Sequence, residues 1–294
     1  MSNPREPTEN DKLFFQYYLV VFLDILGQRG SLRNIKGLPT GEKETSEFIE
    51  KVKETIGKVE NLRTAFSKYF IGAKSFTPDI SKVPAEYQQE FLACQKSEAY
   101  YYGFSDSIIV AVPLASSDEN CSAMNGVFAA LTAASGISLL SLSMKMALRG
   151  GLDVGIATQI SDNEIYGPAL ERAYHLESNV AQYPRFAIGR ELINYLRWVV
   201  EQPSTSHASR IAKEIAKMCK EMIWQDTDGV LMLDFCGAKV KEVACNSLNA
   251  DFVRQAMDFA GTQYQKYSEE ENHELAARYF RLLRYLKSRA NLWN

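Results

Sequence analysis

Two aspartates, Asp24 and Asp106, occupy positions suited to holding a metal ion. Asp24 follows an apolar, β-rich run within residues 17–25, and Asp106 lies between two short strand-like segments. A carboxylate after a buried run must be paired, solvated or metal-bound, because burial of a bare charge is costly. A turn-capping Asp24 and a hairpin-tip Asp106 exposed to solvent are the ordinary alternatives. The pair alone therefore predicts either a metal site or two turn residues.

The segments around these aspartates alternate between strand and helix patterns. Residues 17–25 predict a strand buried on both faces, and residues 43–70 have apolar side chains at helical spacing. Strands at 99–103 and 108–112 predict a hairpin with a polar tip at 104–107. Further helices are predicted at 121–138, 167–178, 191–201 and 248–286, and further strands at 145–157, 183–188 and 229–235. This order indicates an α/β or α+β sheet domain with a helical C-terminal tail.

Composition narrows the class of protein. The chain has 294 residues, a formal net charge of −3 and no concentrated basic region, which argues against nucleic-acid binding. Five scattered cysteines without CxxC spacing favour a reducing cytoplasm. Residues 1–12 are polar, so we expect a disordered arm and no signal peptide. Residues 120–144 carry no charge, but their polar residues favour a buried helix followed by a buried strand over a membrane span.

Other catalytic motifs are missing from the sequence. There is no HExxH, no GxxxxGK[ST] phosphate loop and no GxGxxG. Ser105 and Ser107 are not surrounded by a G-x-S-x-G elbow, which argues against a serine hydrolase. Metalloprotease, P-loop and dinucleotide-binding chemistry are therefore not expected.

Four motifs occur in one linear order: FLDILG at 22–27, FSDS at 104–107, RGGLDVG at 149–155 and IYGPAL at 165–170. In this order they resemble the class III nucleotidyl cyclase domain, over about residues 14–240. Within that class the chain is most similar to the bacterial anti-phage pyrimidine cyclases, the Pycsar enzymes. The ending YLKSRAN at 285–291 adds to this likeness.

The resemblance implies an in-line attack of the ribose 3′-oxygen on the α-phosphorus, with pyrophosphate as the leaving group. Two Mg²⁺ or Mn²⁺ ions would assist, held by Asp24, Asp106 and the Ile25 carbonyl, since hard cations prefer oxygen ligands. Gly27 would let the backbone approach the triphosphate, with the amides of a following helix behind it. Arg149 would grip the pyrophosphate through its bidentate fork, unless it is an ordinary arginine at a strand end.

The base-selecting positions depart from the family's purine cyclases. Tyr102 stands where those enzymes carry a Lys, and Glu164 stands at the second selecting position. Both changes fit a pyrimidine substrate, with uracil favoured by the resemblance and cytosine close behind. Nucleotide binding is expected to involve Phe22, Gly27, Tyr102, Glu164 and Glu171.

The transition-state positions depart further. Glu171 and His175 stand where the family has an Asn and an Arg, and an ionised Glu cannot donate to a phosphate. His175 could donate when charged, and Arg172 or Arg185 could substitute. This altered pair also fits a catalytically degenerate domain that only binds nucleotides.

Together these patterns predict an α+β class III cyclase domain with a ferredoxin-like βαββαβ core and extra strands. We expect a disordered arm at 1–12, the cyclase domain at 13–240 and a helical extension at 241–294. The expected activity is conversion of UTP to 3′,5′-cyclic UMP and pyrophosphate, as second-messenger synthesis in anti-phage defence. A cytidylate cyclase, a purine cyclase and a nucleotide-sensing dimer are the alternatives.

The expected assembly is a cytoplasmic homodimer with two active sites at its interface. One subunit would supply Asp24, Asp106 and Arg149. The other would supply the residues that select the base and stabilise the transition state: Tyr102, Glu164, Glu171 and His175. No effector domain is recognisable, so the receptor for the cyclic nucleotide would be a separate protein, and neither nucleic acid nor a membrane is an expected partner.

Overall fold

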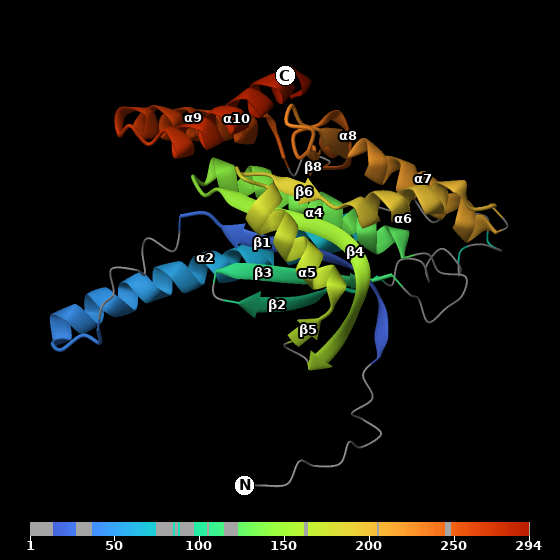
Figure 1. Ribbon diagram of the computed structural model, residues 1–294, viewed down its shortest axis with the longest axis horizontal. Coiled ribbons are helices and arrows are strands. Elements are labelled where there is room, and N and C mark those ends of the chain that lie inside the picture. Colours follow the sequence, from blue (N-terminus) through green and yellow to red (C-terminus); the bar gives the residue numbers. More distant parts are fainter. Residues whose placement is uncertain are drawn as a thin grey trace, which may run out of the picture.

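The structure is a computed structural model that describes residues 14–27, 37–74, 85, 88, 97–104, 106–114, 123–161, 164–204, 206–244 and 248–293. These residues form a mixed α/β fold with one mixed sheet and a helical C-terminal region (Figure 1). The predicted arm at 1–12 and most of the predicted loop at 71–92 lie outside the described residues.

One eight-stranded sheet organises the fold, in the order β2-β3-β1-β4-β6-β8-β7 with β5 paired to β4. Its strands are β1 (Phe15–Ile25), β2 (Tyr100–Phe104), β3 (Ser107–Pro113), β4 (Leu148–Ser161), β5 (Glu164–Tyr166), β6 (Phe186–Ile188), β7 (Ile223–Gln225) and β8 (Leu231–Leu233). β1 lies between β3 and β4 and is antiparallel to both. β2 pairs antiparallel with β3, whereas β4 and β6 are parallel. The predicted hairpin and the central buried strand are confirmed.

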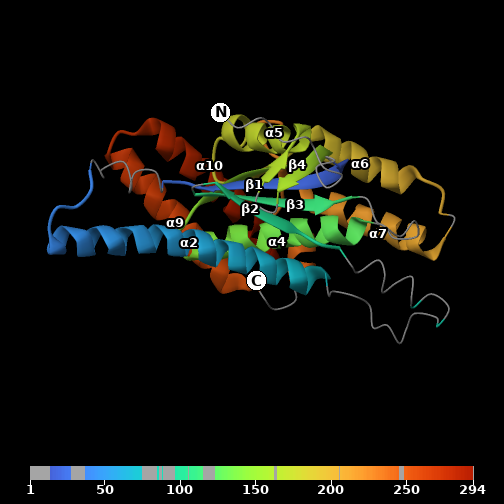
Figure 2. The same cartoon turned by 90° about the horizontal axis from the view of Figure 1, so that it is seen from below.

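Helices cover the sheet unequally. They are α2 (Glu42–Lys74), α4 (Met124–Ser143), α5 (Pro168–His175), α6 (Arg190–Glu201), α7 (His207–Glu221), α8 (Ala238–Ala244), α9 (Ala250–Glu269) and α10 (His273–Arg289). α2 and α4 lie on one face of the sheet and α5 lies on the other (Figure 2). The C-terminal tail, for which the sequence predicts one helical stretch, is two helices, because the chain turns at residues 270–272.

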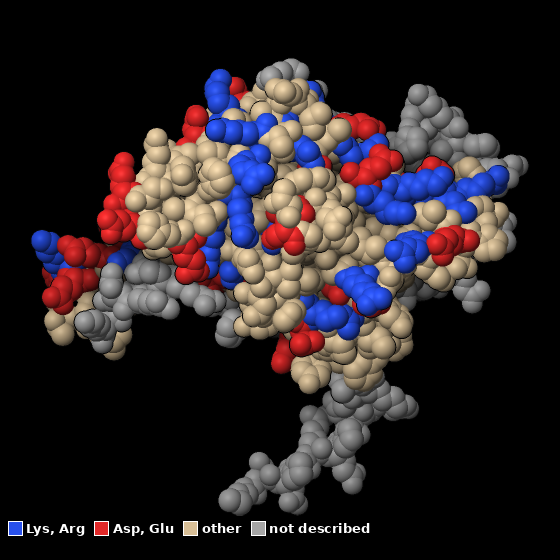
Figure 3. All heavy atoms as spheres, turned by 45° about the horizontal axis from the view of Figure 1, so that its top comes forward, with Lys and Arg blue, Asp and Glu red and all other residues tan. Residues whose placement is uncertain are grey.

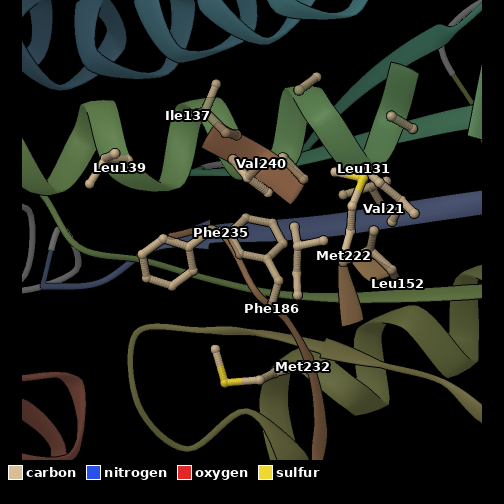
Figure 4. Close-up of a cluster of buried hydrophobic side chains, with 14 of the residues drawn as sticks. Val21, Leu131, Ile137, Leu139, Leu152, Phe186, Met222, Met232, Phe235 and Val240 are labelled. Atoms are coloured by element: carbon tan, nitrogen blue, oxygen red, sulfur yellow. The ribbon is translucent and has the colours of Figure 1, made fainter. Parts of the chain in front are cut away.

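The main core lies between the sheet and the helices of the α2–α4 face. Figure 4 shows Val21 of β1 and Leu152 of β4 among side chains from α4, and Phe186 and Phe235 close by. Alternation along β1 explains the arrangement: Leu19, Val21 and Leu23 enter this core, while Val20 and Phe22 enter a second cluster beneath α5. The sheet therefore has one thickly covered face and one thinly covered face.

α4 is the single helix of the described chain that is long and apolar enough to cross a membrane. Within this fold, 89% of its apolar window is buried by the protein, as in the core helix of a soluble protein. The sequence predicts that the uncharged stretch 120–144 ends in a strand, and this prediction is wrong. Instead the helix continues to Ser143, and β4 begins only at Leu148. The helix can be this long and apolar because nearly all of its side chains are buried against the rest of the protein.

Two glycines of β4 allow α5 to pack directly on the strand backbone. A Cβ on Gly151 would collide with the Ala173 carbonyl oxygen and lie 2.5 Å from the Leu176 Cβ. A Cβ on Gly155 would collide with the Arg172 guanidinium. Small residues at these positions therefore fix the height of α5 above β1 and β4.

Candidate active site

Asp24 lies at the carboxyl end of the central strand, beside two polar residues of its neighbours. Its backbone is in register with Ser107 on β3 and with Arg149 on β4. Leu23 and Ile25 belong to the core under α2 and α4, so alternation places Asp24 on the α5 face with Phe22. The three-strand register therefore gathers a carboxylate, a hydroxyl and a guanidinium at one end of that face.

Asp106 adds a second carboxylate at the same end of the sheet. It occupies the β2–β3 turn, directly before Ser107, whose hydroxyl donates to Asp24 Oδ1 at 3.0 Å. Both aspartates are buried, with 5% exposure for Asp24 and 6% for Asp106. Asp106 Oδ2 is buried without a hydrogen-bond partner in the described part of the chain. A buried oxygen in this state is costly and needs an explanation such as an ion.

The donor set suits a hard cation, but it is small. Among the described residues there is no group of three or more His, Cys, Asp or Glu side chains that could hold a metal ion. A metal held by Asp24 and Asp106 would therefore draw its other ligands from main-chain carbonyls, water or substrate oxygens, which Mg²⁺ commonly accepts. The side chain of Ile25 is buried on the helix side, so only its carbonyl could serve.

Arg149 is held by Glu177, a residue outside the four sequence motifs. Glu177 Oε1 accepts from Arg149 Nε at 2.7 Å and pairs with Nη2 at 2.5 Å. Glu177 is buried in the π-helical turn Leu176–Val180 that continues α5. Wide turns of this kind are frequent at functional sites. Only the fold brings the two residues together, since 28 positions separate them.

Gly27 takes a backbone conformation that suits its residue type. Its φ is +88°, in the left-handed region that favours glycine, and nothing lies within 4 Å of the place a Cβ would take. The helix that was expected to present its amides behind Gly27 is α2, which begins at Glu42, and residues 28–36 before it lie outside the described residues. The expectation that Gly27 lets the backbone approach a triphosphate stays a prediction.

Phe22 and Tyr102 share the cluster under α5. Tyr102 is buried on β2, in register with Ile109 of β3. Phe22 meets the ring of Tyr174 edge-on, with 5.3 Å between ring centroids. Both residues therefore lie on the face that carries Asp24.

Glu164, Glu171 and His175 are exposed side chains. Glu164 begins β5, Glu171 lies in α5, and His175 ends that helix with its Nδ1 3.3 Å from Asn179 Nδ2. In the described part of the chain, none of the three forms a hydrogen bond or ion pair with Asp24, Asp106 or Arg149. Within one subunit these three side chains therefore make no direct polar contact with the site residues in the described part of the chain.

The two arginines considered as replacement donors are engaged elsewhere. Arg185 is fully buried, and its guanidinium binds both Asp226 and Asp228 as well as two main-chain carbonyls. Arg172 bonds Asp153 and the Val154 carbonyl. The expectation that Arg185 could replace the missing transition-state donor is therefore wrong for this conformation, because its guanidinium donors already bind Asp226, Asp228 and main-chain carbonyls.

Asp153 is a further buried carboxylate on the α5 face, and its role here is structural. Its Oδ1 accepts from the Leu192 amide at 2.9 Å in the first turn of α6, and Arg172 pairs with Oδ2 at 3.2 Å. Burial raises the pKa of Asp153, while the Leu192 amide and Arg172 act in the opposite direction. The RGGLDVG motif thus contributes one site arginine and one helix-capping aspartate.

Sequence comparisons assign this constellation to no family. No protein-family model matches the chain, and a search of curated proteins returned no match. The function of the site must therefore be inferred from its residues and geometry.

Proposed function

We propose that this chain is a nucleotidyl cyclase that converts UTP to 3′,5′-cyclic UMP and pyrophosphate. The observation that carries the proposal is the buried, unpartnered Oδ2 of Asp106 beside Asp24, at the ends of adjacent strands. Two buried carboxylates at the ends of adjacent strands favour a divalent cation between them. Mg²⁺ or Mn²⁺ bound there would stabilise the negative charge that develops on the phosphates and lower the pKa of the attacking hydroxyl.

The connectivity of the sheet also supports the proposal. β1, α2, β2, β3, α4 and β4 follow one another, and the strands align as β2-β3-β1-β4 with antiparallel neighbours. This is the ferredoxin-like βαββαβ order expected from the resemblance. The order matters for chemistry, because it brings the end of β1 beside the β2–β3 turn.

The reaction needs orientation and charge stabilisation from the protein. The ribose 3′-oxygen attacks the α-phosphorus, the bond to the bridging oxygen breaks, and the 3′-hydroxyl proton is lost to solvent as pyrophosphate leaves. Ser107 orients the Asp24 carboxylate by donating to one of its oxygens. Glu177 engages Nε and Nη2 of Arg149, which leaves the Nη1 hydrogens to donate to the departing pyrophosphate.

A second subunit would complete the site. The exposed Glu164, Glu171 and His175 form no hydrogen bond or ion pair with Asp24, Asp106 or Arg149 among the described residues, as expected if they serve the partner's site across a dimer interface. In that arrangement another copy would supply part of the wall around a bound substrate.

A nucleotide-sensing dimer without turnover is the second candidate. The observation that favours it is the pairing of Arg149 with Glu177, which neutralises the charge that should grip pyrophosphate. The presence of Glu171 and His175 at the transition-state positions, in place of an Asn and an Arg, also favours a sensor. In that case nucleotide would bind and remain intact.

Incubation of the purified chain with UTP, CTP, ATP and GTP and Mn²⁺, followed by mass analysis, separates these candidates. We expect cyclic UMP and pyrophosphate in equal amounts, and no product from Asp106→Asn. Asp258→Asn is the matched control, because Asp258 lies on α9, outside the strands and the turn that carry the two site aspartates. A dominant purine product would refute the uracil assignment, and tight binding without turnover would favour the sensor.

A further inference from the structure

A cavity of about 520 Å³ lies on the helix side of the molecule, away from the side chain of Asp24. Its walls come from α2, the end of α4, α9 and α10, and residues 25–27 at the end of β1 form one edge. Its volume is in the range of sites that bind small organic molecules. The C-terminal helices, which lie beyond the four sequence motifs, supply one complete side.

The charge of this cavity has one sign. Lys58, Lys145 and Arg278 line it, and no Asp or Glu is among the described residues that do so. The surrounding helix adds to the positive potential. Along α10 the acidic residue is Glu274, and the basic residues are Arg278, Arg281, Arg284, Lys287 and Arg289. Figure 3 shows Lys and Arg side chains gathered over the C-terminal helices.

The cations at the rim are available for a ligand. Lys58 pairs with Glu54, and Arg278 pairs with Glu274, each one turn away on its own helix. Such surface pairs contribute little to stability. Lys145 is exposed and forms no ion pair within the described residues. An anion in the cavity would thus gain three cations at little cost to the fold.

Lys145 also occupies a backbone position that normally favours glycine. Its φ is 61°, and the amides of Lys145 and Met146 bond the carbonyls of Leu142 and Ser141. This is the Schellman ending of α4, in which the left-handed residue is usually Gly. A lysine there is strained, so its presence at this position costs some stability. Complementing the helix C-terminus is one benefit of the charge, and binding an anion is a second.

The remaining residues that line the cavity suit a ligand that contains a planar ring. Tyr267 and Tyr279 stack with 5.7 Å between centroids and 20° between planes. Phe259 and Leu140 provide apolar surface, and Asn61 and Gln263 provide amide donors and acceptors. The lining therefore combines cations, aromatic faces and amides around one space.

We infer that this cavity binds a small organic phosphate monoester with a planar ring. Lys58, Lys145 and Arg278 would bind the phosphate through charge-assisted hydrogen bonds, and the tyrosines and Phe259 would contact the ring. The cavity lies on the opposite side of β1 from the side chain of Asp24, and it meets the proposed catalytic site at Ile25 and Gly27, which line its edge.

Titration calorimetry with AMP and UMP in the Asp24→Asn protein tests this inference, whether or not the chain is a cyclase. We expect binding of at least one of the two, and at least tenfold weaker binding of the matching nucleoside, of ribose 5-phosphate and of inorganic phosphate. Absence of binding by both nucleotides overturns the proposal. Equal binding of inorganic phosphate or of the nucleoside also overturns it.

Two pairs of variants locate the ligand. Lys145→Gly should weaken binding about tenfold and raise the melting temperature by about 2 °C, because glycine relieves the strain. Glu271→Gly is its control: Glu271 occupies the equivalent left-handed position after α9, with φ 55°, but does not line the cavity. It should stabilise the protein similarly and leave binding unchanged.

Arg278→Gln should weaken binding at least tenfold, and Lys217→Met, on α7, should not. Unchanged affinity in both cavity variants overturns the assignment.

Discussion

Ser107 and Glu177 control how the charged residues of the proposed site are presented. Ser107 fixes one oxygen of Asp24, and Glu177 fixes the guanidinium of Arg149. Asp106, in contrast, carries a buried oxygen without a partner among the described residues. A carboxylate maintained in that state costs stability, and proteins commonly accept such a cost where the group acts on a ligand or substrate.

Replacing Asp106 by Asn should therefore stabilise the metal-free protein while abolishing cyclisation. The neutral amide lowers the desolvation cost of the buried group, by about 1–2 kcal/mol. Urea unfolding with EDTA present measures the change, with Asp258→Asn on α9 as the control. A less stable Asp106→Asn protein would show that the carboxylate has a structural partner instead.

Asp153 should make stability depend on pH. Because burial raises its pKa in the folded state above the ordinary carboxyl value near 3.8, folding favours its protonated form. Its contribution is therefore fully present below that ordinary value and is lost as pH rises through the raised pKa. The free energy of unfolding of wild type, measured relative to Asp153→Asn, should fall as pH rises from the ordinary carboxyl value near 3.8 through the raised pKa of Asp153. A difference that stays flat or rises over this range would contradict the assignment.

At the scale of elements, the contact between β4 and α5 determines where the site residues lie. β4 carries Arg149, and α5 leads directly into the turn that carries Glu177. Their close approach depends on Gly151, which faces Ala173 and Leu176. The distance between these two elements therefore decides whether Arg149 can be held.

Gly151→Ala should destabilise the protein by about 1–3 kcal/mol, as expected for overpacking in a close contact. Gly57→Ala is the control, because Gly57 lies within α2 and nothing lies within 4 Å of the place its Cβ would take. That change should stabilise the protein by about 0.5–1 kcal/mol. Urea denaturation of both variants measures the contrast. Equal effects would show that α5 can shift without cost.

At the scale of the whole molecule, the C-terminal helices share the core with the sheet domain. Val253, Ala256 and Phe259 of α9 belong to the same buried cluster as β1 and α4. On α10, the Tyr285 hydroxyl donates to Asp234 Oδ1 and accepts from the Cys236 amide. These buried contacts join the extension to the end of the sheet, and they hold one wall of the cavity that we propose to bind a phosphate monoester.

The proposed shared site predicts complementation between inactive subunits. Asp24→Asn and Glu164→Ala proteins should each be weak or inactive, and a mixed dimer should regain activity at one of its two sites. Asp24→Asn mixed with Asp106→Asn is the matched control and should stay inactive, because both changes fall on the same side of the interface. Measurement of cyclic UMP in purified heterodimers decides the matter. No recovery in the first mixture would mean that the residues are divided differently.

The sequence by itself determined the strong local elements: the strand that ends at Asp24, the helix α2, and the hairpin that carries Asp106. The periodicity of apolar residues is a property of one continuous segment, so it can be recognised without knowledge of the tertiary structure. Only the tertiary structure decided the pairing of Arg149 with Glu177, the capping of α6 by Asp153, and the burial of Arg185. Each joins residues far apart in the chain, and no local pattern encodes such a partner. The three-residue strands β5 and β7 were missed for the same reason, because pairing with a neighbour, and not their own composition, makes them strands.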